Sequence, residues 1–219
     1  MDIKTIGLTK IYARKGLQEV AAVRDINLHV FSGEKIALTG PSGSGKSTLI
    51  HLLGLMDRAT SGQIFIDDKQ VDFSDDNFSC RMRRDCIGFV FQFHYLLADF
   101  TVLENTLMPV YNKRQNFLQK ALDILDRLGL LERRNNFPNE LSGGQQQRAA
   151  LARALINSPK IIFADEPTGN LDTVTGNAIE KLLFEACAQN NTTLFLVTHN
   201  EALANKADRI LKMEDGGIR

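Results

Sequence analysis

Eight residues near the start of the chain have the spacing of a phosphate-binding loop. Residues 40–47 fit the pattern G-x-x-x-x-G-K-[ST] and follow a short apolar run at 35–39. The glycines let the backbone turn sharply, so that loop amides can point at phosphate oxygens beside the positive end of a following helix. Lys46 is expected to reach the β- and γ-phosphates, and the Ser47 hydroxyl to ligate Mg²⁺. We predict that this loop binds a nucleotide through Gly40, Pro41, Ser42, Gly43, Ser44, Gly45, Lys46, Ser47 and Thr48.

Two adjacent carboxylates, Asp165 and Glu166, follow an apolar run of strand length farther along the chain. A carboxylate at such a strand end can reach Mg²⁺ through water, and a second one can take a proton from an attacking water. The alternative is a polar strand end that caps the next helix.

A second glycine-rich turn reads Ser142-Gly143-Gly144-Gln145. Ser142 and Gln145 have the spacing of a capping box at the start of a helix. Two glycines in a first turn cost about 1 kcal/mol each relative to alanine, so we expect a further reason for them. Exposed amides at a helix N-terminus bind phosphate. Since the first loop already surrounds its own nucleotide, we predict that this turn faces a nucleotide held by another copy of the chain.

Three single residues stand at the ends of predicted strands. Gln92 and His199 follow apolar runs, where the ligand crevice of a parallel sheet is expected. For His199, contact with a γ-phosphate and a purely structural role both stay open. Tyr12 ends the first strand, where it either stacks on an adenine ring or packs as tyrosines usually do.

The hydrophobic pattern places these residues on strands and helices that form one α/β domain. Strands are predicted at 3–11 and 20–31, joined by a polar turn at 13–16, and at 35–39, 63–67, 87–91, 160–164, 193–198 and 209–213. Helices are predicted at 48–53, near 81–84, within 93–159 and at 173–189. The alternation predicts a mainly parallel sheet with an N-terminal antiparallel part. Within this domain of residues 1–219, residues 1–92 and 160–219 form the core, and 93–159 an inserted helical subdomain that carries the second turn.

Composition narrows the class of protein. The chain has 219 residues, with 26 Lys and Arg balanced by 26 Asp and Glu, so no basic excess points to nucleic acid. It has no signal-peptide pattern and no apolar run near the ~18 residues of a spanning helix. We therefore expect a soluble protein that meets a membrane only through partners. The spacing of its three cysteines is not that of a metal site, which favours free thiols in a reducing cytoplasm.

Together these motifs resemble the ATP-binding subunits of ABC transporters over essentially the whole chain. Residues 40–47 are similar to the Walker A loop of that family, 161–166 to Walker B, and 141–148 to the family signature. Gln92 resembles the Q-loop residue, residues 170–172 the D-loop, His199 the switch histidine and Tyr12 the adenine-stacking residue. The resemblance implies a P-loop NTPase fold, ATP and Mg²⁺ as cofactors, and a translocase-class ATPase that couples ATP hydrolysis to transport.

The same resemblance implies roles for individual residues. Glu166 would polarise the attacking water, His199 would sense the γ-phosphate, and Lys46 would act with them. Ser47, Gln92 and Asp165 would hold the metal. Two copies of the chain would form a head-to-tail homodimer that sandwiches two ATP molecules. The contacts to the partner's ATP would come from Ser142, Gly143, Gly144 and Gln145.

A narrower resemblance concerns residues 91–105, which look like the ATPases of bacterial lipoprotein-releasing complexes, the LolD family, with Ala98 where that family commonly has proline. It implies LolC/LolE-like integral membrane permeases as partners and a peripheral position on the cytoplasmic face of the inner membrane. The apolar side chains that follow Gln92 suggest a docking groove at 92–104 for a permease helix.

Other classes remain as alternatives. MacB-type efflux ATPases and FtsE-like cell-division ATPases share the block at 165–172. DNA-repair or chromosome-structure ATPases would carry long heptad segments between the two Walker motifs, which this chain lacks. Glu166 and His199 disfavour a purely regulatory nucleotide-binding module, and a small-molecule kinase would not explain residues 141–145.

Overall fold

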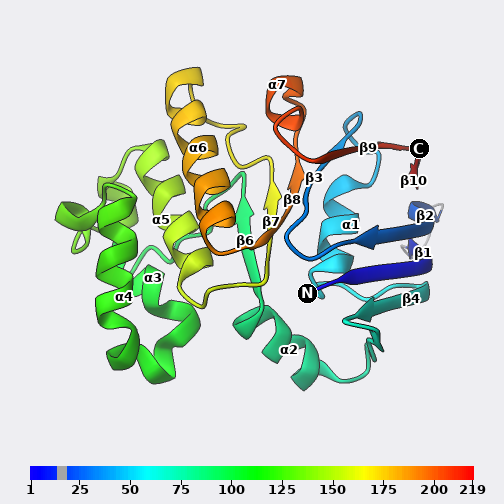
Figure 1. Cartoon of the computed structure of the whole chain (residues 1–219), viewed down its shortest axis with the longest axis horizontal. Coiled ribbons are helices and arrows are strands. Elements are labelled where there is room, and N and C mark those ends of the chain that lie inside the picture. The colour runs from blue at the N-terminus through cyan, green and yellow to red at the C-terminus, as the bar shows by residue number, and fades with distance from the viewer. Residues whose placement is uncertain (14–18) are drawn as a thin grey trace. The chain divides into compact units, whose positions relative to one another are not determined.

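The computed structural model describes residues 1–13 and 19–219 (Figure 1). Most of the turn predicted at 13–16 lies outside these described residues. The chain divides into two compact units, of which unit 1 comprises residues 1–83 and 193–219, and unit 2 comprises residues 84–192. The helical segment predicted at 93–159 falls within unit 2.

Unit 1 contains a four-stranded antiparallel sheet in the order β2-β1-β4-β5. On β1, Ile3, Thr5 and Leu8 point to the buried side, and the register with β2 shifts between Thr5 and Leu8, where Gly7 has a positive φ of 60°. This irregular pairing keeps apolar residues inward on both sides of the shift. The strands are β1 (Ile3–Tyr12), β2 (Val20–Val30), β4 (Ser61–Ile66) and β5 (Lys69–Gln70).

The second part of unit 1 is built around β3, which pairs in parallel with β8 on one side and β9 on the other. The central residues of β3 are fully buried, as a strand covered on both faces requires. The phosphate loop follows β3 directly and leads into α1. The elements are β3 (Lys35–Thr39), α1 (Lys46–Leu53), β8 (Thr193–Val197), α7 (Glu201–Ala204), β9 (Arg209–Glu214) and β10 (Gly217–Ile218), which is antiparallel to β9.

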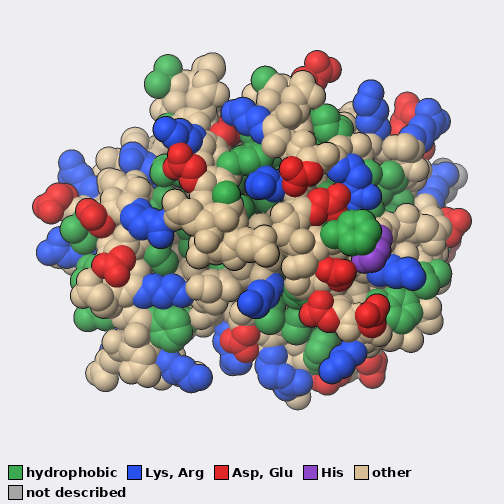
Figure 2. Space-filling view, viewed as in Figure 1, with side chains coloured by type: hydrophobic (Ala, Val, Ile, Leu, Met, Phe, Trp, Pro, Cys, Tyr) green, Lys and Arg blue, Asp and Glu red, His purple; other side chains and the backbone are tan. Residues whose placement is uncertain are grey.

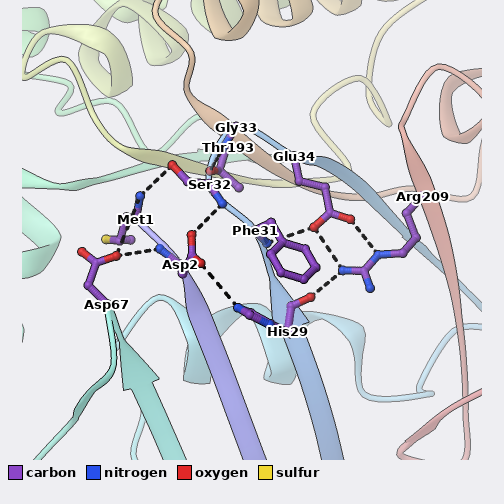
Figure 3. A network of polar contacts seen from close by, with 10 residues as sticks. All are labelled: Met1, Asp2, His29, Phe31, Ser32, Gly33, Glu34, Asp67, Thr193 and Arg209. Atoms are coloured by element: carbon purple, nitrogen blue, oxygen red, sulfur yellow. Dashed lines mark hydrogen bonds and ion pairs between the residues drawn. The ribbon is translucent and has the colours of Figure 1, made fainter.

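A polar network joins the antiparallel sheet of unit 1 to its parallel strands (Figure 3). Arg209 of β9 donates to the backbone oxygen of His29 at 2.6 Å and forms an ion pair with Glu34 at 2.8 Å. Asp2 accepts a hydrogen bond from the backbone of Ser32 at 2.8 Å, and lies 3.5 Å from the His29 ring. These bonds hold the end of β2 and the turn that enters β3, and thereby the strand that positions the phosphate loop.

Unit 2 pairs two short parallel strands with a set of helices. The strands β6 (Ile87–Phe91) and β7 (Ile161–Asp165) run in parallel with Phe91 opposite Asp165, and α5 and α6 lie side by side (Figure 1). The elements, with α2 at the border of the units, are α2 (Asp76–Asp85), α3 (Val102–Leu107), η1 (Met108–Lys113), α4 (Arg114–Arg127), η2 (Leu131–Arg133), η3 (Pro138–Glu140), α5 (Gly143–Leu155) and α6 (Thr173–Gln189). The strand predicted at 87–91 and the helix predicted at 173–189 have their predicted bounds.

The surface carries charges of both signs. Figure 2 shows Lys and Arg side chains interspersed with Asp and Glu on the face it draws, in keeping with the equal counts of 26 in the sequence. In the part of the chain that the structure describes, every helix is too short or too polar to cross a membrane.

Candidate nucleotide-binding site

The backbone of the phosphate loop is shaped by glycines with positive φ. Gly40 and Gly45 have φ values of 148° and 105°, and a Cβ at these positions would lie 2.1 Å from the oxygen of Met213 and 2.0 Å from that of Ala22. A side chain at either position would therefore clash with a neighbouring backbone oxygen, and the positive φ would strain the backbone of the substituted residue itself. At Gly43, by contrast, a Cβ would meet nothing within 4 Å. The loop is thus packed from behind and leaves open space at Gly43.

The polar groups of the loop suit an anion. Ser44 is buried, and within the described residues its hydroxyl oxygen has no hydrogen-bond partner. Lys46 is 6% exposed, and its ammonium donates to the oxygens of Gly40 at 2.9 Å and Pro41 at 2.8 Å. The helix α1 starts at Lys46 and has no acidic residue in its first turn. A phosphate would find a buried hydroxyl, a cation and a helix N-terminus at this one loop.

Tyr12 lies at the end of β1, where the residue is 42% exposed and its hydroxyl is bound to Asp57. The hydroxyl donates to Oδ2 of Asp57 at 2.8 Å, while Lys10 Nζ donates to Oδ1 at 2.7 Å and lies 4.9 Å from the centre of the Tyr12 ring. Partial burial and the bond to Asp57 raise the pKa of the Tyr12 phenol. Neither Lys10 nor Asp57 belongs to a sequence motif, so no local pattern predicts their contacts with Tyr12.

His199 is exposed and stands two residues beyond β8. It lines a cavity of about 580 Å³ together with Gly40, Pro41 and Lys212, all of which belong to unit 1. The structure therefore brings the predicted histidine and the start of the phosphate loop to one cavity.

Gln92, Asp165 and Glu166 lie at one edge of the strand pair in unit 2. Because Phe91 is opposite Asp165 in parallel register, the residues that follow the two strands leave the sheet at the same end. Glu166 is half-buried with a φ of +48°, which is rare for a residue other than glycine. Its backbone oxygen accepts from Gly169 N at 3.0 Å and closes a turn. Strained backbone of this kind often marks a functional position.

The Gln92 side chain is bound to the loop that follows Glu166. Its Nε2 donates to Oδ1 of Asn170 at 3.0 Å, and Nδ2 of Asn170 donates to the backbone oxygen of Gln92 at 3.3 Å. The sequence placed both residues in motifs, but their contact joins positions 78 residues apart.

The predicted capping box at the start of α5 is confirmed. Ser142 Oγ accepts from the backbone of Gln145 at 3.4 Å, and the Gln145 side chain accepts from the backbone of Ser142 at 2.9 Å. The two glycines inside it have different surroundings. A Cβ on Gly144 would lie 2.2 Å from Thr175 Cγ2, so packing of α5 against α6 accounts for it, whereas a Cβ on Gly143 would make only ordinary contact at 3.5 Å.

The helix α5 also holds the segment after Gln92. Gln147 is fully buried, donates to the oxygen of Phe91 at 3.1 Å and contacts the ring of His94. Arg153 donates to the backbone oxygens of Tyr95 at 2.6 Å and His94 at 2.8 Å, and burial lowers the pKa of its guanidinium. One helix therefore links the glycine-rich turn at its start to the strand end that carries Gln92.

Residues 93–100, here called the exposed apolar segment, have apolar side chains on a fixed backbone. Phe93, Tyr95 and Leu97 are 63%, 65% and 43% exposed. The buried side chain of Asn105 accepts from Leu97 N at 2.8 Å and donates to the oxygens of Leu97 and Phe100. These bonds hold the segment in place, so the exposure of its side chains is a feature of the fold.

The predicted metal ligands lie in both units. Ser47 is exposed in unit 1, and Gln92 and Asp165 are half-buried in unit 2. Among residues 1–13 and 19–219, no group of three His, Cys, Asp or Glu side chains could by itself hold a metal ion. The hydroxyl, amide and carboxylate oxygens of these residues are each of the kind that Mg²⁺ prefers as ligands.

Comparison with known proteins gives consistent matches. A family model described as "ABC transporter" matches residues 23–169. The chain is 42% identical to the lipoprotein-releasing system ATP-binding protein LolD of Rickettsia bellii, over 99% of this chain and 97% of that one. It is 45% identical to the LolD protein of Cytophaga hutchinsonii, over 91% of this chain and 92% of that one.

Two solved structures are also similar. The dimeric structure of MJ0796, described as a bacterial ABC transporter cassette, superposes with a TM-score of 0.91 at 40% sequence identity, over 99% of this chain and 96% of that one. A second dimeric structure of that cassette, bound to ADP and Pi, superposes with a TM-score of 0.88 at 37% sequence identity, over 99% of this chain and 96% of that one.

Proposed function

The chain belongs to the ABC transporter family, and we propose that it is the ATP-binding and ATP-hydrolysing subunit of a lipoprotein-releasing system. The phosphate loop is the observation that carries this proposal, because its glycines, buried hydroxyl and lysine suit a nucleoside triphosphate. The name shared by the relatives from Rickettsia and Cytophaga supports lipoprotein release as the process that is driven.

In the proposed complex of this chain with ATP, the loop amides and Lys46 bind the phosphates, and the ring of Tyr12 stacks on the adenine. Ser47, Gln92 and Asp165 supply oxygen ligands for Mg²⁺, which neutralises charge on the phosphate oxygens when bound. This assignment rests on residue type and on position, because Ser47 follows β3, Gln92 follows β6 and Asp165 is the last residue of β7.

Glu166 is the proposed general base. It takes a proton from the water that attacks the γ-phosphorus, the bond to the β–γ bridging oxygen breaks, and ADP and phosphate leave. Lys46 stabilises the charge on the transferred group, and His199 contacts the γ-phosphate.

The test separates binding from hydrolysis. Glu166→Gln is expected to keep ATP affinity and to lose about 10²–10⁴-fold in turnover, the usual contribution of a positioned base. Lys46→Ala is expected to weaken ATP binding itself, measured by equilibrium titration. Near-normal turnover by the Glu166→Gln protein would place the base elsewhere.

The proposed partners are a second copy of this chain and integral membrane permeases of the LolC/LolE kind, which hold it at the cytoplasmic face of the inner membrane. The dimeric relatives support the first. The exposed apolar segment supports the second, because exposed aromatic and leucine side chains on a fixed backbone suit an inserted helix.

Leu97→Glu tests the docking surface. Because the Leu97 side chain is 43% exposed and its backbone is held by Asn105, the variant should fold and hydrolyse ATP alone. It is expected to lose co-purification with the membrane chains. Leu118→Glu is the matched control, since Leu118 of α4 is 44% exposed and lies outside the exposed apolar segment. Assembly of the Leu97→Glu protein at the wild-type level would contradict the docking surface.

A further inference from the structure

The two bonds between Gln92 and Asn170 determine which end of the Gln92 amide points away from the loop. A backbone carbonyl can only accept, so the NH₂ group of Asn170 must face the oxygen of Gln92. The Oδ1 atom of Asn170 then faces the Gln92 side chain and requires a donor, which is Nε2 at 3.0 Å. The Oε1 atom is the other substituent of that amide carbon and is directed away from Asn170.

The orientation matters because the two ends of an amide differ in chemistry. The amide oxygen is a ligand for a hard cation such as Mg²⁺, while the NH₂ group is a donor and repels it. Without a partner that distinguishes the two ends, the Gln92 amide could turn over and present the wrong one.

The loop is also shaped to receive this side chain. A Cβ on Gly169 would lie 3.0 Å from Gln92 Nε2 and 3.3 Å from its Cδ, so a larger residue would push the amide away. Gly169 N donates to the oxygen of Glu166 at 3.0 Å, which places Gly169 and Asn170 on the turn that starts at the proposed base.

We propose that Asn170 is a positioning residue for Mg²⁺, which holds the Gln92 amide with its oxygen toward the cation. This inference rests on the proposed function, in which Gln92 is a metal ligand of the ATP site. Asn170 does not touch the metal itself, and its effect passes through Gln92.

The experiment measures cation binding directly in the full chain. All variants carry Glu166→Gln, which is expected to prevent hydrolysis of the bound ATP. The affinity of the protein–ATP complex for Mn²⁺ is then measured by electron paramagnetic resonance. Asn170→Ala should weaken Mn²⁺ binding about three- to tenfold, as the loss of a modest hydrogen bond would. The affinity for ATP in EDTA should stay unchanged, and Asn77→Ala, at an exposed asparagine of α2, should leave both affinities unchanged.

Two further variants make the mechanism specific. Gly169→Ala keeps Asn170 but crowds the Gln92 amide, and it should weaken Mn²⁺ binding in the same way. In the Gln92→Ala protein, which lacks the ligand, adding Asn170→Ala should cause no further loss, because residues that act as one unit are not additive.

The outcomes are distinct. Wild-type Mn²⁺ affinity in Asn170→Ala, or an undiminished effect of that change in the Gln92→Ala protein, would overturn the positioning role. Wild-type Mn²⁺ affinity in Gln92→Ala alone would overturn it too, while leaving ATP binding and the proposed ATPase intact. Failure of the parent protein to bind ATP at all would instead refute the proposed function.

Discussion

Asp57 is a single carboxylate that ties together the end of β1 and the chain beyond α1. Partial burial opposes its ionisation, but hydrogen bonds from Lys10, Tyr12 and the backbone of Arg58 outweigh this and lower the pKa of the carboxyl. The hydroxyl of Tyr12, and with it the ring proposed to stack on adenine, is therefore fixed by an ionised partner.

The lowered pKa of Asp57 predicts a dependence of stability on pH. Its contribution to the free energy of unfolding is fully present above the unfolded-state pKa of about 4, and is lost as the pH falls through the lower folded-state value. In urea unfolding, Asp57→Asn should be less stable than the wild type at pH 7, and the difference should shrink on acidification below pH ~4.

Asp68→Asn, at an exposed turn between β4 and β5, is the control for that measurement. A difference between the wild type and Asp57→Asn that stays constant down to pH ~2 would contradict the role of the ionised carboxylate.

The start of α5 combines a structural glycine with one that packing does not require. Gly144→Ala would bring a methyl group within 2.2 Å of Thr175 Cγ2 and is expected to lower the free energy of unfolding by about 1–3 kcal/mol, as overpacking usually does. Thr175→Ser removes the clashing methyl group, so the double variant should recover most of the loss in a chemical denaturation experiment.

Gly143→Ala is the comparison for Gly144→Ala at the same turn. Its methyl group would make only ordinary contact with Leu171, so stability should change little. Equal destabilisation by both alanine substitutions would show that the packing of α5 on α6 does not distinguish the two glycines.

ATP is expected to control the oligomeric state of the whole chain. If each nucleotide bridges the phosphate loop of one copy and the α5 turn of the other, it adds binding energy to the dimer alone, and mass action favours that state. Glu166→Gln should be a monomer without nucleotide and a dimer with ATP, as measured by light scattering. Ser142→Arg should keep ATP binding and abolish the dimer. A dimer that forms without nucleotide and tolerates Ser142→Arg would contradict the bridged arrangement.

Local patterns in the sequence were sufficient for the parts of the molecule whose residues are neighbours along the chain. The loop at 40–47, the capping box at Ser142 and the helix at 173–189 each depend on residues a few positions apart, so spacing and periodicity predict them. The strands β5 and β10 were not predicted, because segments of two residues form only through pairing with β4 and β9.

Tertiary structure alone decided the contacts between side chains far apart in sequence. Tyr12 meets Asp57 across 45 residues and Gln92 meets Asn170 across 78, and no periodicity records such pairs. The same reason applies to Gly144. Its lower helix propensity has no local explanation in the sequence, and the close packing of α6 against α5 supplies one. The sequence by itself determined which motifs the chain carries. Packing decided which partners position them, because a contact depends on where distant segments meet in space.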